Sequence, residues 1–168
     1  EDGERHVLHF GASMKAAEVR ILDTWHTMGM RGTGSHDVVL DDLFVPDAGV
    51  ALKRKSGEWH PLFHTISTIA FPLIYSVYLG VAESARDTAI AIAKRKSPND
   101  HAVRLAGCME TELTGARLAH ESMLAAVRRN EPSAETVNQV MIGKQLVTRH
   151  AIAAVELAME LAGGAGFY

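Results

Sequence analysis

The sequence predicts an α+β chain that is mostly helical, in which strands of a partial β-barrel precede an incomplete up-and-down four-helix bundle. Residues 1–59 contain half of the fourteen glycines and several short runs of alternating apolar and polar residues, a pattern typical of strands. Residues 60–168 are rich in alanine and carry apolar residues at helical spacing over long stretches. We therefore expect two domains, 1–59 and 60–168.

The first domain is predicted to contain three strands, because its apolar residues alternate with polar ones. In the first run, His6, Leu8 and Phe10 are expected to share one face. Pro46 ends the third and strongest run, since proline cannot donate to a ladder. About three strands cannot close a barrel, so this part needs partner strands. The expected strands span residues 5–10, 18–24 and 37–46.

The second domain is predicted to contain three long antiparallel helices joined by short loops. Pro72 marks either a bend in the first helix or its first turn, because proline lacks an amide donor. Asn99 or Asp100 is expected to cap the second helix. Ser133 is expected to cap the third helix, which Gly163 ends. The expected helices span residues 64–96, 99–129 and 133–163.

Each helix has an apolar stripe at helical spacing, and we expect these stripes to be buried. Cys108 lies within the second helical pattern and is predicted to be a small buried hydrophobe rather than a reactive thiol. The expected stripes are Leu73, Val77, Val81, Ala85, Ala89 and Ile92, then Val103, Ala106, Met109, Leu113, Ala116, Leu124 and Val127, and finally Val137, Met141, Val147, Ala151, Val155 and Ala158.

Charge and composition argue against several classes of protein. The net charge of −3 gives no basic field that would attract nucleic acid or an anionic membrane. No uninterrupted apolar run approaches the ~18 residues of a membrane span. The acidic start at residues 1–4 is unlike the basic start of a signal peptide. We expect a cytoplasmic protein.

A glycine-rich loop at residues 28–36 joins two expected strands, and its glycines allow positive φ angles. No helix follows it, so a tight connection between strands is favoured over a phosphate-binding loop. Arg31, Ser35 and His36 are placed for contact with a substrate. Hydrogen bonding within the loop and packing between subunits are the alternatives.

A second glycine-rich segment follows the third expected helix. Glycines in this position expose backbone N–H groups and let a ligand or a neighbouring subunit approach closely. Gly163, Gly164 and Gly166 are therefore candidate ligand contacts, although a plain helix C-cap accounts for Gly163 equally well.

The remaining titratable residues do not form a catalytic set. His120 falls on an apolar stripe and is predicted to be a core histidine. His60 and His64 are spaced at i, i+4 but have no carboxylate partner, so no metal site is expected. Asp41 and Asp42 are adjacent in an expected strand and point to opposite faces, so they cannot act as a pair. No catalytic residue can be named.

Residues 25–46 closely resemble the hallmark segment of the acyl-CoA dehydrogenase superfamily. Met-Gly-x-Arg, small hydroxyl residues, an apolar strand, an acidic residue and Val-Pro follow one another in that order. Residues 79–82 and 163–167 are similar to later motifs of the family. The resemblance implies a flavin-dependent, usually tetrameric oxidoreductase with N-terminal helices, a middle β-barrel and a C-terminal four-helix bundle. Residues 1–59 would be the C-terminal part of the barrel, and residues 60–168 a truncated bundle.

The sequence Gly-Thr-Gly-Ser-His-Asp at residues 32–37 is similar to that of the flavin hydroxylase branch of the superfamily. Enzymes of this branch use reduced FMN and oxygen on aromatic or polycyclic substrates. The resemblance implies either acyl-CoA dehydrogenation or, slightly favoured, FMN-dependent hydroxylation, so the flavin is FAD or FMN. A flavin reductase or an electron-transfer flavoprotein would be the redox partner. The alternative is a helical oligomerisation module without activity, and the isolated chain is expected to be inactive.

The resemblance also implies particular cofactor residues. Glu160 falls where the family has a glutamine near the pyrophosphate, and a carboxylate there repels phosphate unless it is screened. Ala70 and Phe71 fall where some members have a glutamate or an arginine, so no catalytic base is expected within these residues. The implied flavin contacts are Arg95, Lys96, Gly163, Gly164 and Gly166.

Overall fold

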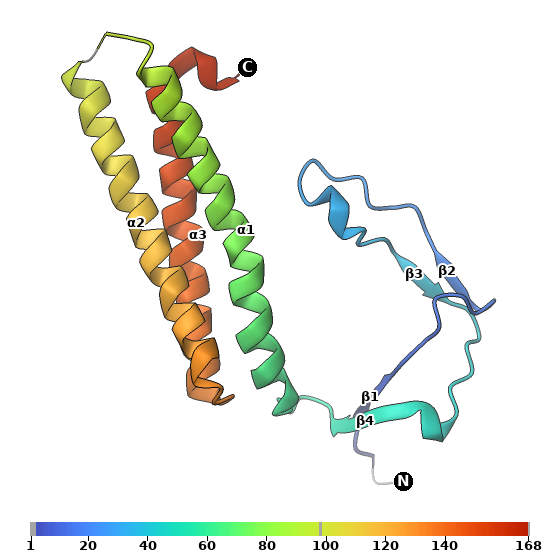
Figure 1. Cartoon of the computed structure of the whole chain (residues 1–168). Coiled ribbons are helices and arrows are strands. Elements are labelled where there is room, and N and C mark those ends of the chain that lie inside the picture. The colour runs from blue at the N-terminus through green and yellow to red at the C-terminus, as the bar shows by residue number, and fades with distance from the viewer. Residues whose placement is uncertain (1–2, 98, 168) are drawn as a thin grey trace. The chain divides into compact units, whose positions relative to one another are not determined.

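The computed structural model describes residues 3–97 and 99–167. It divides into two compact units, Glu1–Trp59 and His60–Tyr168 (Figure 1). The first unit is built from short strands, and the second is built from three long helices. The prediction of a mostly helical α+β chain is confirmed.

The first unit contains β1 (His6–Phe10), β2 (Val19–Ile21), β3 (Val38–Leu40) and β4 (Val50–Lys55). They form two separate two-stranded antiparallel sheets, β1 with β4 and β2 with β3. In the second sheet, Val19 lies opposite Leu40, and Val19 is the buried hydrophobic residue of this unit. The described residues form no closed barrel, in agreement with the expectation of a partial one.

The strands differ from the sequence prediction in two respects. The third expected strand, 37–46, is reduced to the three residues of β3. The chain bends directly after β3, and Asp42 has a left-handed φ of 53°, so Asp41 and Asp42 lie in a bend rather than in a strand. β4 was not expected, because three successive basic residues at 53–55 mask its alternation.

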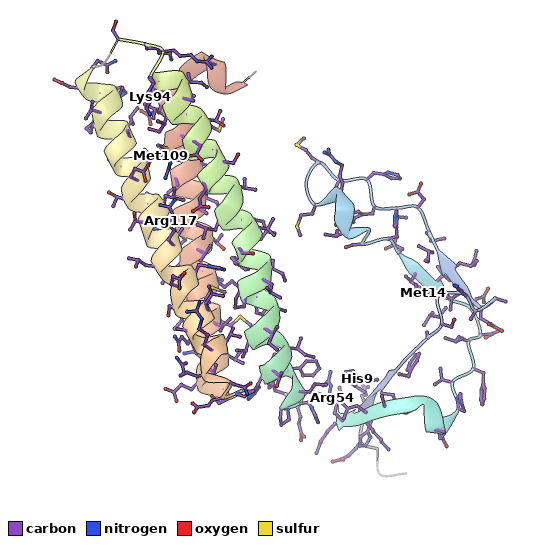
Figure 2. The ribbon with its side chains drawn as sticks, in the orientation of Figure 1. His9, Met14, Arg54, Lys94, Met109 and Arg117 are labelled. Atoms are coloured by element: carbon purple, nitrogen blue, oxygen red, sulfur yellow. The ribbon has the colours of Figure 1, made fainter. Side chains whose placement is uncertain are left out.

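His6, Leu8 and Phe10 share one face of β1, as expected, and this is the more exposed face of the strand. The opposite face carries a contact between the two strands of the first sheet. Nε of Arg54 in β4 donates to Nε2 of His9 in β1 at 3.1 Å, and Figure 2 shows the two side chains next to each other.

The second unit contains α1 (Leu62–Ala93), α2 (Asp100–Arg129), α3 (Ala134–Ala162) and the short 3-10 helix η3 (Gly163–Phe167). Two expected caps are confirmed. The side chain of Asn99 accepts a hydrogen bond from the amide of Ala102, and the side chain of Ser133 accepts one from the amide of Thr136. Pro72 lies inside α1 rather than in its first turn.

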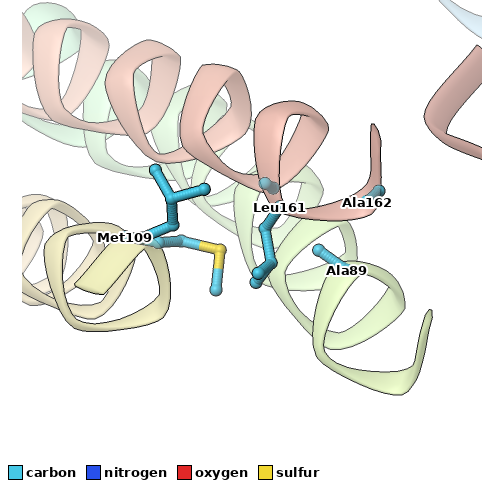
Figure 3. Close-up of a cluster of buried hydrophobic side chains, with 6 residues drawn as sticks. Ala89, Met109, Leu161 and Ala162 are labelled. Atoms are coloured by element: carbon cyan, nitrogen blue, oxygen red, sulfur yellow. The ribbon is translucent and has the colours of Figure 1, made fainter. Parts of the chain in front are cut away.

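α3 packs along both other helices, so it is the central helix of the unit. At one end, Met109 of α2 and Leu161 of α3 are buried in one cluster with Ala89 of α1 and Ala162 (Figure 3). At the other end, Met123 is fully buried beside Val140 and Val147. The small residues of α1 and α3 allow the helices to approach closely.

Only part of the expected stripe of α1 is buried. Leu73, Val77 and Val81 are 65 %, 57 % and 58 % exposed, whereas Ala82 and Ala89 are buried. Small residues of α1 thus lie in its contact with the other helices, together with larger ones such as Phe71 and Leu79. Leu73, Val77 and Val81 face outward. We call the outward residues Leu73, Val77 and Val81 the open face of α1.

α1 is long and apolar enough to cross a membrane by length and composition, although only 22 % of its most apolar window is buried. This corrects the expectation that no stretch qualifies as a membrane span. The expectation failed because it required an unbroken apolar run, whereas α1 contains scattered Ser, Thr and His residues between its apolar ones. Core helices of many-helix domains have the same composition, so the finding alone does not indicate a membrane.

Two residues of α2 that were predicted to be buried are exposed in the structure. Cys108 is exposed, so the prediction of a buried hydrophobe is wrong. It precedes the fully buried Met109 by one residue, which turns it about 100° away around the helix. Val103, expected on the buried stripe, is 66 % exposed. The prediction of a core histidine is confirmed, because His120 is buried and its Nε2 lies 2.9 Å from the carbonyl oxygen of Pro72.

Candidate functional site

One end of the helical unit brings together residues from the two expected cofactor segments. Lys96 lies three residues beyond the end of α1, and Gly163 ends α3 with a φ of 65°. The ammonium of Lys96 donates to the carbonyl oxygen of Ala162 at 3.1 Å. It also lies 3.8 Å from the position that a Cβ on Gly163 would occupy. This contact places a cation at the negative end of α3, where carbonyl groups lack helical partners.

The glycine-rich segment after α3 forms the turn of η3 rather than an extended loop. A Cβ at Gly166 would lie 3.4 Å from Cβ of Ala162, so this glycine packs back onto α3. At Gly164, no described atom lies within 4 Å of the Cβ position. Gly164 is therefore the place in this turn where another molecule could approach the backbone.

Charged groups of both signs surround this end of the bundle. Oε1 of Glu160 lies 3.8 Å from Nε2 of His101, and both side chains are more than half exposed. A cavity of about 140 Å³ lies between them and Lys96. Arg95 is exposed, and the described residues offer its guanidinium no partner. Lys96 and Arg95 supply donors that fit an anionic group, whereas the carboxylate of Glu160 opposes one.

In the first unit, the glycine-rich loop connects β2 to β3, which confirms the predicted strand-to-strand connection. Its backbone is left-handed at Met30, with a φ of 53°, and at Gly34, with a φ of 54°. The carbonyl oxygen of Met30 accepts hydrogen bonds from Nε1 of Trp25 at 3.1 Å and from the hydroxyl of Thr33 at 2.9 Å. These bonds fold the loop into a fixed turn.

The predicted substrate-contact residues lie on this turn. Arg31 donates to the carbonyl oxygen of Met28 at 3.3 Å, so its guanidinium is partly engaged within the loop. The hydroxyl of Ser35 lies 3.2 Å from that of Thr33. His36 accepts hydrogen bonds at Nδ1 from the loop backbone. Arg31, Ser35 and His36 thus lie on one loop, each bonded to a different neighbour, in a different unit from Lys96.

No sequence pattern predicted the contact between His150 of α3 and Glu112 of α2. Nδ1 of His150 lies 2.7 Å from Oε2 of Glu112, and both side chains are about one-third exposed. Thirty-eight residues separate them, so no local spacing could indicate the pair. Among the described residues, no group of three metal-binding side chains gathers here or elsewhere.

A cavity between α1 and α3 was also not predicted. It has a volume of about 480 Å³ and an almost entirely apolar lining that includes Tyr75, Tyr78 and Val155. The rings of Tyr75 and Tyr78 are tilted at 58° to each other, with their centroids 5.3 Å apart. The cavity could not be predicted, because the sequence does not tell which side of α1 lacks a neighbouring helix.

The strand unit is followed by a long helical unit with a glycine-rich turn, the order of elements that the family resemblance implies. A profile of the family described as acyl-CoA dehydrogenase, C-terminal domain, matches residues 72–168. This match covers more than half of the chain. The chain therefore belongs to the acyl-CoA dehydrogenase family.

Two relatives and one solved structure extend the likeness. YdbM of Bacillus subtilis, named as an acyl-CoA dehydrogenase, is 33 % identical over 85 % of this chain and 39 % of its own length. The amino sugar nitrososynthase DnmZ of Streptomyces peucetius is 27 % identical over 88 % of this chain and 39 % of its own. KijD3, solved in complex with FMN and a dTDP-linked amino keto sugar, is 26 % identical with a TM-score of 0.83. The KijD3 match covers 100 % of this chain and 44 % of KijD3.

The chain spans about two fifths of the length of the curated relatives that it matches. One of these relatives is named as an acyl-CoA dehydrogenase, and the other is named as an amino sugar nitrososynthase. The family is therefore established, and the reaction has to be argued from the site.

Proposed function

We propose that the whole protein is a flavin-dependent oxidoreductase that uses FMN to oxygenate a small molecule, in preference to dehydrogenating an acyl-CoA. The observation that carries this proposal is the likeness of the entire chain to KijD3, a protein solved with FMN bound. DnmZ, which is named as an amino sugar nitrososynthase and not as a dehydrogenase, supports the same choice. Residues 32–37 support hydroxylation of an aromatic or polycyclic substrate, and a nucleotide-linked amino sugar is the alternative substrate.

Flavin, when bound, supplies the redox chemistry, and the protein supplies its position. Lys96 and Arg95 would hold an anionic part of the flavin, because one ammonium and one guanidinium lie at the same end of the bundle. The open backbone at Gly164 would let the flavin approach, while Gly163 and Gly166 give η3 its shape. In the other unit, Arg31, Ser35 and His36 would contact the substrate.

Acyl-CoA dehydrogenation is supported by the name of YdbM and needs a base near the acyl chain. Ala70 and Phe71 lie in α1 where the resemblance puts a glutamate or an arginine in some members, and neither side chain can take up a proton. Dehydrogenation would therefore depend on a base from another part of the whole protein.

The cofactor distinguishes the two reactions. Flavin released from the purified whole protein and identified by chromatography should be FMN, and reduced FMN with oxygen should support turnover. FAD as the sole bound flavin, together with reduction of that flavin by an acyl-CoA, would establish dehydrogenation instead.

The cofactor residues can be tested in the same protein. Gly164→Trp should weaken flavin binding at least about ten-fold, because the backbone approach is blocked, which corresponds to about 1.4 kcal/mol. Gly107→Trp is the matched control, since the Cβ position of Gly107 on α2 is equally open. Equal flavin affinity in both variants, with both proteins folded, would remove Gly164 from the proposed site.

A second function is supported by the open face of α1, whose three side chains are more than half exposed. Exposed apolar residues in such number on one helix are typical of a surface that packs against protein. The chain of residues 1–168 would then act as an oligomerisation module of a cytoplasmic homotetramer and be inactive alone. The purified chain should show no flavin absorbance after FMN addition and gel filtration if it serves assembly only.

A further inference from the structure

His36 closes the neck of the loop between β2 and β3. Its Nδ1 accepts hydrogen bonds from the backbone amides of Thr24 at 3.2 Å and Trp25 at 3.1 Å. These amides belong to the segment that leaves β2, whereas His36 belongs to the segment that enters β3. One imidazole nitrogen therefore ties together two chain segments that lie on either side of the loop.

The two amides fix the protonation state of the ring. A nitrogen that accepts two N–H groups uses its lone pair, so this arrangement requires the neutral tautomer that carries its hydrogen on Nε2. This ring cannot act as a general base through Nδ1 while the loop is closed. A proton on Nδ1 would face both amide hydrogens and break both bonds.

A partner for the protonated ring is already in place. Oδ1 of Asp23 lies 3.7 Å from Nδ1 of His36 and is largely exposed. The other titratable group here is His26, whose Nε2 lies 3.6 Å from the same carboxylate oxygen. Asp37 follows His36 in the chain, and its amide donates to the hydroxyl of Thr24 at 3.0 Å. The neck therefore has one arrangement for neutral His36 and a different partner for the imidazolium.

We propose that His36 is a positioning residue that holds the loop between β2 and β3 closed as the neutral imidazole and releases it on protonation, when the ring turns to Asp23. The side chain is 29 % exposed, so protons reach it from solvent. Arg31 and Ser35 lie within the loop that this residue closes. If these side chains bind substrate, which rests on the proposed function, substrate contact is lost when a proton on Nδ1 of His36 breaks the two amide bonds.

The amide of Trp25 is the best reporter of the closed neck. The amide of Thr24 also donates to the carbonyl oxygen of Leu22 at 2.9 Å, so it stays partly protected when the ring moves. The amide of Trp25 has His36 as its hydrogen-bond partner among the described residues. Loss of one hydrogen bond should lower its protection against hydrogen exchange about five-fold.

The test measures amide exchange of the full chain across the pH range in which His36 titrates by NMR, after correction for intrinsic exchange. Protection of Trp25 should fall about five-fold as His36 becomes charged. His36→Asn should keep the protection and remove its pH dependence, because an amide oxygen accepts the same two N–H groups and never takes up a proton. His36→Ala should lose the protection at every pH.

Two controls separate this role from general acid sensitivity. His26→Asn removes the other imidazole near Asp23 and should leave the transition in place. Asp23→Asn removes the partner of the imidazolium and should move the transition to lower pH. The proposal is overturned if protection of Trp25 stays constant while His36 titrates, or if His36→Asn retains the pH dependence. Neither outcome bears on flavin binding, so failure here leaves the proposed function intact.

Discussion

Nδ1 of His150 in α3 lies 2.7 Å from Oε2 of Glu112 in α2, and the imidazole rests against the backbone of α2 at Gly115. A Cβ on Gly115 would lie 3.0 Å from the same Nδ1. The absence of a side chain at residue 115 therefore gives the imidazole the room to reach the carboxylate.

Gly115→Ala tests this relationship as a double-mutant cycle. In a His150→Ala background, alanine at residue 115 should stabilise the chain by about 1 kcal/mol, the usual helical advantage over glycine. In the natural background this gain should vanish, because the added methyl displaces the imidazole and breaks a bond of about 1 kcal/mol. Urea unfolding of the four proteins gives the coupling energy. An equal gain in both backgrounds would contradict the proposed packing.

Gly143→Ala should destabilise the helical unit by about 1–3 kcal/mol, because the new methyl overlaps a buried side chain. Its Cβ position lies less than 2.5 Å from Cγ of Met123, which is fully buried, and 3.3 Å from the backbone oxygen of Ala119. Gly107→Ala is the control, since no atom lies within 4 Å of its Cβ position, and it should stabilise by up to about 1 kcal/mol. Thermal unfolding should separate the two variants in opposite directions from the natural chain.

Lys96→Met should weaken the end of α3 by about 0.5–1 kcal/mol, because the carbonyl oxygen of Ala162 loses its ammonium partner. Lys94→Met removes the same charge two residues earlier, at the end of α1 in Figure 2, where the side chain has no partner among the described residues. Hydrogen exchange of residues 159–167 should therefore rise in the first variant and stay constant in the second. A matching rise in both would mean that net charge, and not the contact, stabilises this end.

His120→Leu should lower the free energy of unfolding by about 1 kcal/mol, because the buried hydrogen bond to the carbonyl oxygen of Pro72 is lost. His120→Gln keeps an N–H donor of similar reach and should recover part of this loss. Denaturant unfolding at neutral pH measures both variants. If the leucine variant is as stable as the natural chain, the hydrogen bond of His120 does not stabilise the fold, and the residue only fills space.

The helices were predictable because their boundaries are set by local chemistry. Asn99 and Ser133 cap the helices that the sequence predicted them to cap. Such a cap is predictable because its hydrogen bond joins residues only three positions apart. Burial was less predictable. Leu73 and Val77 have the spacing of a buried stripe, but they are exposed because burial depends on which neighbours a helix has.

The candidate sites also differ in how far they could be predicted. The contact between Lys96 and the end of α3 joins residues sixty-six positions apart. The family resemblance nevertheless implied that both segments contact the flavin. The pair of Glu112 and His150 carries no motif and was not predicted. β4 was also missed, because consecutive basic residues hide a strand whose pairing with β1 is decided by tertiary structure.

The open face of α1 determines how the isolated chain behaves in practice. Only 22 % of the most apolar window of α1 is buried, so the helix exposes an apolar surface to solvent. Detergents and fluorescent hydrophobic dyes bind to such surfaces. Dye fluorescence should therefore be high for the isolated chain and fall when this helix is covered in the whole protein. The same surface favours concentration-dependent aggregation during purification, so α1 is itself a readout of how completely the protein has been assembled.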